Sequence, residues 1–133
     1  KLLEIKVEKK RRTKINFMHK SINEVIRDKG NTFLTKQDLI YSVGLFDYLT
    51  SDVARHLTSV FYESLNPTGI FIVGNFDPLN ETRNQMEYIC EWYLTHRNEQ
   101  EMLNLSNALP NLKECFIEKD PTKINNFLVA KRG

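Results

Sequence analysis

Aromatic, amide and carboxylate side chains follow directly after two glycines of this sequence. The stretch 44–48 reads Gly-Leu-Phe-Asp-Tyr, and the stretch 74–77 reads Gly-Asn-Phe-Asp. Glycine lets a ligand approach the backbone closely. An aromatic ring beside an amide and a carboxylate suits a flat heterocycle or a polarised small molecule. These two stretches are therefore the candidate ligand-binding segments of the chain.

Residues for covalent or metal chemistry are not evident in the sequence. Ser42 falls inside an apolar run, and the three histidines have no obvious partner. There is no Walker-type loop, no dinucleotide-binding fingerprint and no clustered spacing of metal ligands. We therefore expect no metal site and a function that depends on binding and positioning.

The candidate residues also have structural interpretations. Phe46, Tyr48 and Phe76 have the character of core aromatics. Asp47 lies ahead of a predicted helix, which it would cap. The histidine–arginine pair at 96–97 ends another predicted helix, where cations are expected, and it would equally suit an anionic ligand. The residue types alone leave both interpretations open.

Two apolar runs position the candidate segments. Residues 39–43 form an unbroken apolar run, typical of a strand buried on both faces of a parallel sheet, and residues 70–75 predict a second fully buried strand. Between them a helix with one apolar face begins at Thr50 or Ser51 and ends near Leu65. This order predicts a βαβ unit. Its strands end at one edge of the sheet, where open α/β sheets bind ligands.

The rest of the chain predicts further elements of one α/β domain. Ser21 with Glu24 forms a capping box that begins a helix. The remaining expected elements are a helix end over 1–12, a strand over 14–18, a helix from 80 or 82 to 95, a helix over 99–109, and an antiparallel hairpin of strands 114–119 and 126–131.

Composition and charge fit an ordinary globular domain. The 133 residues are 41% hydrophobic and 27% charged, with a formal net charge of +2. This charge argues against a dedicated nucleic-acid binder, although basic residues crowd positions 6–14 as a phosphate-binding arm or a solvated helix end. No apolar run approaches the ~20 residues of a membrane span, and no signal peptide is visible. We therefore expect a cytoplasmic location, no contact with nucleic acid, and a small-molecule substrate.

The sequence resembles the C-terminal part of bacterial class I S-adenosylmethionine-dependent methyltransferases. It is similar to the subgroup that makes fatty-acid methyl esters as extracellular signals. The resemblance covers nearly the whole chain from residue 14 onward and is carried by DLIYSVGLFDYL (38–49), LNPTGIFIVGNF (65–76), MEYICEWYLTHR (86–97) and DPTKINNFLV (120–129). It implies a partial Rossmann-like sheet, containing strands three to seven of the family, with flanking helices and a C-terminal antiparallel hairpin.

The resemblance also implies roles for individual residues. The cofactor S-adenosylmethionine would lie against Lys20, Ser21 and Ile22 through its adenine, and against Val43, Gly44, Leu45 and Phe46 through its methionine part. The catalytic group facing the acceptor would be Asp47, Tyr48, His96 and Arg97, with Asn75, Tyr88 and Trp92 binding the substrate. Methyl transfer is an in-line displacement that positioning can accelerate. A carboxylate acceptor would need little help from a base, and His96 or Arg97 would orient it.

Two cofactor-binding features of the family are absent from the sequence. These are the glycine-rich loop after strand one and the acidic residue after strand two that holds the ribose. Losing the two ribose hydrogen bonds removes roughly 3–6 kcal/mol, since bonds to charged groups contribute about 1.5–3 kcal/mol each. That corresponds to about a hundredfold to ten-thousandfold in affinity. We therefore expect the chain to be a portion of a longer catalytic domain that is inactive alone and binds the cofactor weakly.

Without strands one and two, the strand at 39–43 would be an exposed sheet edge, which folded proteins avoid. We expect the segment 14–18 or a second chain to cover this edge. The second alternative implies a homo-oligomer or association with the missing N-terminal part. A different class of function also remains open, namely a non-catalytic α/β interaction domain that keeps the fold without the cofactor site.

Overall fold

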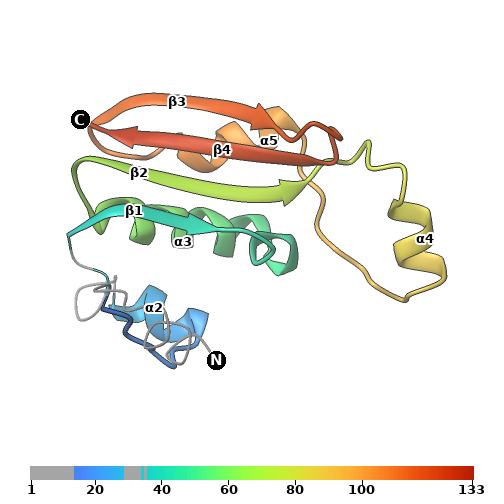
Figure 1. The fold of residues 1–133 in the computed structure, drawn as a ribbon, viewed down its shortest axis with the longest axis horizontal. Coiled ribbons are helices and arrows are strands. Elements are labelled where there is room, and N and C mark those ends of the chain that lie inside the picture. The colour runs from blue at the N-terminus through green and yellow to red at the C-terminus, as the bar shows by residue number, and fades with distance from the viewer. Residues whose placement is uncertain (1–13, 29–33, 35) are drawn as a thin grey trace.

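The computed structural model describes residues 14–28, 34 and 36–133. Their centre is one four-stranded sheet in the order β1-β2-β4-β3 (Figure 1). β1 (Gln37–Ser42) and β2 (Leu65–Phe76) run parallel, and β4 (Asn125–Arg132) pairs antiparallel with β2 and with β3 (Leu112–Lys119). The α/β fold class and the closing hairpin are therefore confirmed.

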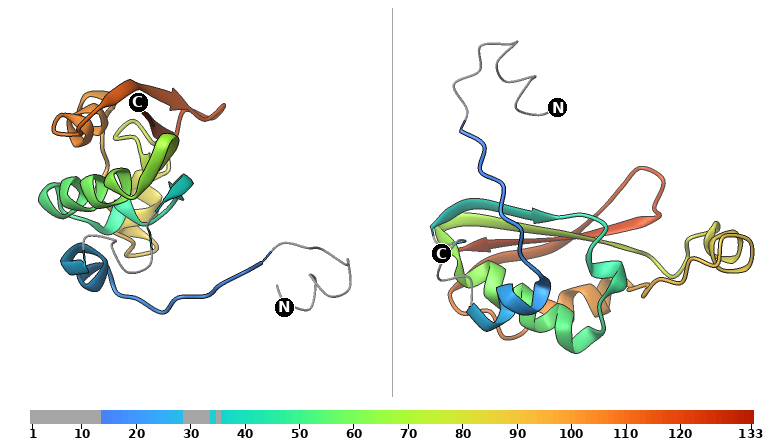
Figure 2. Two further views of the ribbon diagram at one scale, coloured as in Figure 1. Left: turned by 90° about the vertical axis from the view of Figure 1, so that its left-hand side faces the viewer. Right: turned by 90° about the horizontal axis from the view of Figure 1, so that it is seen from below.

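Helices cover only one face of this sheet within the described part of the chain. They are α2 (Ile22–Asp28), α3 (Ser51–Glu63), α4 (Arg83–Tyr88) and α5 (Glu99–Leu103), with the 3-10 turns η1 (Phe46–Tyr48) and η2 (Asn104–Ser106). Both views in Figure 2 show α2, α3 and α5 on the same side of the strands. Figure 1 shows α4 projecting beyond the end of the sheet.

The β1–α3–β2 unit forms with the predicted order and parallel pairing, but the prediction that residues 39–43 are buried on both faces is wrong, since Leu39, Tyr41 and Val43 are exposed. α3 places Ala54, Leu57 and Tyr62 in the core, where they join Phe71 of β2 and Leu128 of β4. Burying such side chains is the main favourable contribution to folding. The unit can position a ligand site because both parallel strands end at the same edge of the sheet, where open α/β sheets bind ligands.

The strand expected over 14–18 is not formed. Residues 14–20 have no regular secondary structure, and Phe17 and Met18 are exposed. A strand needs a neighbour for its backbone hydrogen bonds, and the described chain supplies none beside this segment. β1 is consequently an edge strand, with the Tyr41 side chain 71% exposed.

The prediction of a long helix that reaches Thr95 is also wrong, because only its first turns form. α4 ends at Tyr88, and Glu91 has a left-handed backbone with φ +50. From there the N–H of Thr95 donates to the Asp47 carbonyl at 2.7 Å, and the N–H of Arg97 donates to the Phe76 carbonyl at 2.9 Å. Tertiary partners thus take N–H groups that a helix would use internally.

The remaining predictions lie close to the observed elements. The capping box of Ser21 and Glu24 begins α2, and a second capping box at Asn98 begins α5. The helix expected over 99–109 is shorter, since α5 passes into η2 and ends near Ser106. The basic cluster lies outside the described residues except for Lys14. Among the helices of the described chain, none is long and apolar enough to cross a membrane.

Candidate functional site

Three segments meet at the carboxyl ends of β1 and β2. The first is η1, which contains Asp47, the second is the end of β2 at Asn75, and the third is the segment 92–97, which ends in Arg97. All three named side chains are almost fully buried. The sequence-based prediction that residues of the two strand ends lie together is therefore met by the geometry.

Arg97 is the centre of this cluster. Its Nη1 donates to the Phe46 carbonyl at 2.9 Å and to Asn75 Oδ1 at 2.6 Å, and its Nη2 donates to the Leu49 carbonyl at 2.6 Å. Burial lowers the pKa of the guanidinium, and the nearby charges of Asp47 and Glu101 oppose that shift. With 2% of its surface exposed, Arg97 ties the loop after β1 to the end of β2.

Asp47 is held between the same segments. Its Oδ1 accepts a hydrogen bond from the Phe76 N–H at 2.8 Å, and its carbonyl accepts from Thr95. Burial raises the pKa of the Asp47 carboxyl, and the hydrogen bond from Phe76 and the charges of His96 and Arg97 only partly offset this. Asp47 lies in η1 ahead of α3, but Thr50 is the residue that precedes that helix.

An open aromatic wall lies beside these buried groups. Trp92 Nε1 donates to the Tyr48 hydroxyl at 2.9 Å, and the Trp92 ring stands edge-on to Phe76 with centroids 6.5 Å apart. The centroid of the His96 ring lies 6.0 Å from the centroid of the Phe76 ring. Tyr48 and Trp92 keep 60% and 43% of their surfaces exposed. Both rings are therefore accessible from solvent.

His96 carries a free ring nitrogen in this wall. Its Nδ1 lies 3.1 Å from the Leu94 carbonyl, whereas its Nε2 is buried with no hydrogen-bond partner in the structure. Buried polar atoms are normally paired. Because Nε2 is buried, an acceptor group of a ligand would pair with it only after a shift of the His96 ring exposed it.

The predicted cofactor segment after β1 is only partly accessible. Gly44 has φ +83, and a Cβ built there would meet nothing within 4 Å, while Val43 is exposed. Leu45 packs against the core, and Phe46 is fully buried with its ring 6.4 Å from that of Phe71. The open backbone at 43–44 fits part of a ligand, but the Phe46 side chain cannot touch one.

The other predicted cofactor residues stand at the start of α2. Ser21 is occupied by its capping box with Glu24, and Lys20 forms an ion pair with Glu24 at 3.5 Å. Ile22 packs against the hydrophobic core. Tyr88 ends α4, where it is 82% exposed and away from the strand ends (Figure 1).

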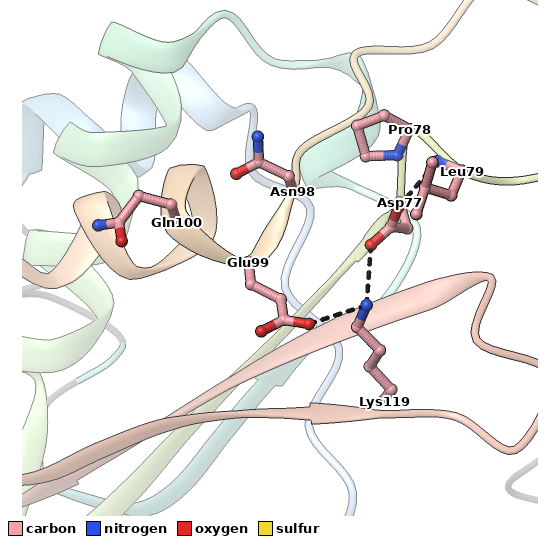
Figure 3. Close-up of a pocket in the computed structure, with 7 residues that line it drawn as sticks. All are labelled: Asp77, Pro78, Leu79, Asn98, Glu99, Gln100 and Lys119. Atoms are coloured by element: carbon pink, nitrogen blue, oxygen red, sulfur yellow. Dashed lines mark hydrogen bonds and ion pairs between the residues drawn. The ribbon is translucent and has the colours of Figure 1, made fainter.

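A second polar network supports the strand ends and was not predicted. Asp77 Oδ2 accepts from Asn126 Nδ2 at 2.7 Å, and Asn126 Nδ2 also donates to the Arg97 carbonyl at 2.9 Å. Lys119 Nζ lies 3.3 Å from Asp77 and 2.9 Å from Glu99, as Figure 3 shows. The sequence signals were Asp77 in the candidate segment 74–77 and the polar pair 125–126 at the start of β4.

This network borders a hollow of about 510 Å³. Burial alone would raise the pKa of Asp77, but hydrogen bonds from Leu79, Asn126 and Lys119, with the charge of Lys119, outweigh it and lower that pKa. The hollow is lined by Asp77, Pro78, Leu79, Asn98, Glu99, Gln100 and Lys119 (Figure 3). No group of three or more potential metal ligands converges there or elsewhere in the described chain.

Comparisons with known proteins bear on the fold. No protein-family model and no curated protein matches the sequence. An O-methyltransferase family protein from Burkholderia thailandensis superposes with a TM-score of 0.65 at 8% identity, covering 99% of this chain and 40% of that one. Human N-acetylserotonin methyltransferase in complex with S-adenosylmethionine gives 0.64 at 14% identity, covering 94% and 36%.

A third similar structure is magnesium protoporphyrin IX methyltransferase from Synechocystis with bound S-adenosylhomocysteine. It gives a TM-score of 0.63 at 10% identity, covering 99% of this chain and 57% of that one. The chain thus spans between about a third and somewhat more than half of these structures. At such identities the likeness concerns the fold, and the chain has the partial Rossmann-like α/β fold of S-adenosylmethionine-dependent methyltransferases.

Proposed function

We propose that this chain forms the acceptor side of an S-adenosylmethionine-dependent methyltransferase site. The observation that carries the proposal is the cluster of Asp47, Tyr48, Trp92 and His96 at the carboxyl ends of two parallel strands, on a fold that solved methyltransferases share. Ligands bind at this edge in open α/β sheets.

The proposed acceptor is a carboxylate, specifically that of a fatty acid. The cofactor supplies a methyl group on a sulfonium, and a carboxylate oxygen is already a competent nucleophile, so the site needs no catalytic dyad. His96 would hold the acceptor carboxylate against the Tyr48–Trp92 wall through Nε2, which lacks a protein partner but is buried and would have to be exposed by a shift of the ring when the acceptor binds. Holding the reacting atoms in line contributes most of the acceleration in such a site.

Arg97 has a different proposed role from the one expected from sequence. Its guanidinium donates to three protein oxygens and is almost fully buried, so it is unsuited to orienting a substrate carboxylate. We assign it to positioning: it holds η1, which contains Asp47 and Tyr48, against Asn75. The aromatic wall thereby keeps its shape before the acceptor arrives.

On the donor side, the described residues fit only part of the cofactor. The open backbone at Val43 and Gly44 suits a close approach, whereas Ser21 is engaged by Glu24 and Phe46 is buried. The sequence also lacks the glycine-rich loop and the ribose-binding acid. We therefore propose that the 133-residue chain by itself binds S-adenosylmethionine weakly and is inactive alone.

No strand of the described chain pairs with the outer edge of β1, and this supports a proposal about partners. Tyr41, Ile72 and Val129 lie side by side across three strands. The described helices leave one face of these strands open (Figure 2). Parallel strands are normally covered on both faces, and open edges invite pairing. We propose that the chain associates through this edge with a second copy. The open sheet face and the edge of β1 also favour the alternative function, that of a non-catalytic interaction domain.

The transfer of a labelled methyl group tests the proposed function. The protein expressed from its complete gene is incubated with S-adenosylmethionine labelled on the methyl group and with hexadecanoic acid. We expect label in the organic extract that alkaline hydrolysis releases as methanol, and a loss of at least tenfold in the His96→Ala variant. Unlabelled acceptor together with absent binding of S-adenosylhomocysteine would refute the proposal, and labelled acceptor with full activity in His96→Ala would refute the role of His96.

A further inference from the structure

A second group of exposed apolar side chains continues from the aromatic wall. We define the arm as residues 78–95, which leave the end of β2, form α4 and return to the body at Thr95 (Figure 1). Most side chains of this size are buried in a folded protein, and contiguous exposed ones mark binding surfaces. On the arm the exposed ones are Leu79, Tyr88, Ile89, Trp92 and Tyr93.

The arm has its own small core, so these side chains are exposed on a folded unit. Met86 is buried, and its sulfur is contacted by Asn80 Nδ2 at 3.6 Å and by Thr82 Oγ1 at 3.7 Å. The Met86 carbonyl accepts from the Trp92 N–H at 2.9 Å, which ties the returning limb to α4. The arm therefore has a fixed outer surface.

Trp92 joins this surface to the candidate site. Its indole N–H binds the Tyr48 hydroxyl, and its ring packs against Phe76 at the end of β2. At the other end, Leu79 lines both the hollow beside Lys119 and an adjacent hollow of about 370 Å³. Exposed apolar side chains thus lie at the aromatic wall, along the arm, and, at Leu79, beside two hollows.

We infer that the arm binds an extended apolar chain of the acceptor and selects acceptors by chain length. This inference rests on the proposed function and adds the residues that would set its specificity, chiefly Ile89 and Tyr93. An elongated ligand fits because the exposed apolar side chains are distributed along the length of the arm. Of these side chains, only Leu79 lines the two hollows.

The charges of the arm restrict the same ligand. Glu87 is neutralised by Arg83 at 2.7 Å, but Glu81 and Glu91 are exposed. A second anionic group on the far end of the ligand would be repelled there, since like charges raise the free energy of the complex. An uncharged hydrocarbon chain is therefore the ligand that we propose for the arm.

The single tryptophan of the chain reports directly on this surface. Trp92 is the only tryptophan in the sequence, so its fluorescence is titrated in the 133-residue chain with hexadecanoate, kept below its micelle-forming concentration, and with butanoate. We expect a saturable change with hexadecanoate at a concentration at least a hundredfold lower than with butanoate. Equal responses to the two acids, or no response to either, would overturn the inference.

Paired variants locate the binding surface. The arm variant carries Ile89→Ser and Tyr93→Ser, and the control variant carries Phe17→Ser and Met18→Ser, which are similarly exposed residues outside the arm. Circular dichroism confirms that both variants are folded. We expect hexadecanoate affinity to fall at least tenfold in the arm variant only. An equal loss in both variants, or none in the arm variant, would contradict the inference.

The titration separates this inference from the proposed function, because it requires neither cofactor nor methyl transfer. If the chain binds hexadecanoate on the arm while the protein from the complete gene transfers no methyl group, the proposed function fails and the arm remains a lipid-binding surface. If methyl transfer occurs but the arm variant keeps the chain-length profile, only the inference fails.

Discussion

At the scale of single residues, Arg97 shows how far a side chain's environment can decide its role. In the sequence it stands at the end of a predicted helix beside a histidine, where either a dipole-stabilising cation or an anion-binding residue is reasonable. The structure buries it against the carbonyls of Phe46 and Leu49 and the amide of Asn75. Only long-range contacts distinguish these possibilities, and the sequence contains no signal for them.

Replacing Arg97 by methionine tests this positioning role. The Arg97→Met change removes the Arg97 donors of Asn75 Oδ1 and the Leu49 carbonyl and leaves the Phe46 carbonyl with only the Leu49 N–H. Each buried acceptor that loses its partner costs about 1–3 kcal/mol. We expect the free energy of unfolding in urea to fall by about 3 kcal/mol or more. The matched control is Arg55→Met, because Arg55 is exposed and pairs with Asp52 at 3.2 Å, and we expect it to change stability by less than about 0.5 kcal/mol. Similar losses in both variants would contradict the role.

The buried carboxyl group of Asp47 leads to a prediction about how the stability of the protein depends on pH. Its folded pKa is raised by burial, so its favourable contribution is present below the unfolded value of about 3.9 and is lost as pH rises through the folded pKa. Asparagine keeps an acceptor for the Phe76 N–H without the charge. We expect Asp47→Asn to be at least as stable as wild type at pH 7, with the difference vanishing near pH 3, as measured by thermal unfolding at both values.

A variant that is less stable than wild type at pH 7 would show that the Asp47 charge stabilises the fold. The complementary measurement is methyl transfer by the protein from the complete gene. If Asp47 acts on the acceptor, Asp47→Asn will lose activity while keeping its stability, which is the behaviour of a buried charge retained for function.

At the scale of elements, sequence patterns were reliable where local chemistry decides the structure. The capping box at Ser21 begins a helix as predicted, and the apolar runs of β1 and β2 form parallel strands. The predictions failed where distant partners decide. The segment 14–18 has a strand pattern without a neighbouring strand in the described chain. The chain leaves α4 after Tyr88, and the N–H groups of Thr95 and Arg97 are bonded to the body instead of to a helix.

The junction of three strands at Asp77 gives a prediction at this scale. Its carboxylate receives hydrogen bonds from Leu79, Asn126 and Lys119 and therefore joins β2, β3 and β4. Because its folded pKa is lowered, its contribution to stability is present above a pH of about 4 and is lost as pH falls through the folded value. We expect Asp77→Ala to be less stable by about 2 kcal/mol or more at pH 7.

The difference between wild type and Asp77→Ala should shrink as the pH falls toward 2 in urea titrations. Glu99→Ala is the matched control, since it removes the other carboxylate on Lys119 but from an exposed position. We expect its effect to stay below about 1 kcal/mol. A constant Asp77→Ala difference from pH 2 to pH 7 would mean that the charge of Asp77 is not responsible.

At the scale of the whole molecule, the open sheet face and the β1 edge predict association. An isolated chain has a mass of 15.7 kDa, and we expect light scattering of the 133-residue chain to give at least twice that value. Lysine on an edge strand prevents pairing, so Leu39→Lys should return the chain to the mass of a monomer. A monomeric wild type at concentrations up to about 100 μM would contradict the proposed interface.

The central claim is that the chain holds the acceptor side of a methyltransferase site without a complete donor side. Isothermal titration of the 133-residue chain with S-adenosylhomocysteine tests this claim directly. The fold and the open backbone at Gly44 allow contact with the cofactor, but the sequence supplies neither the glycine-rich loop nor the ribose-binding acid. We predict no binding tighter than about 100 μM, and saturable binding at micromolar concentrations would contradict the account.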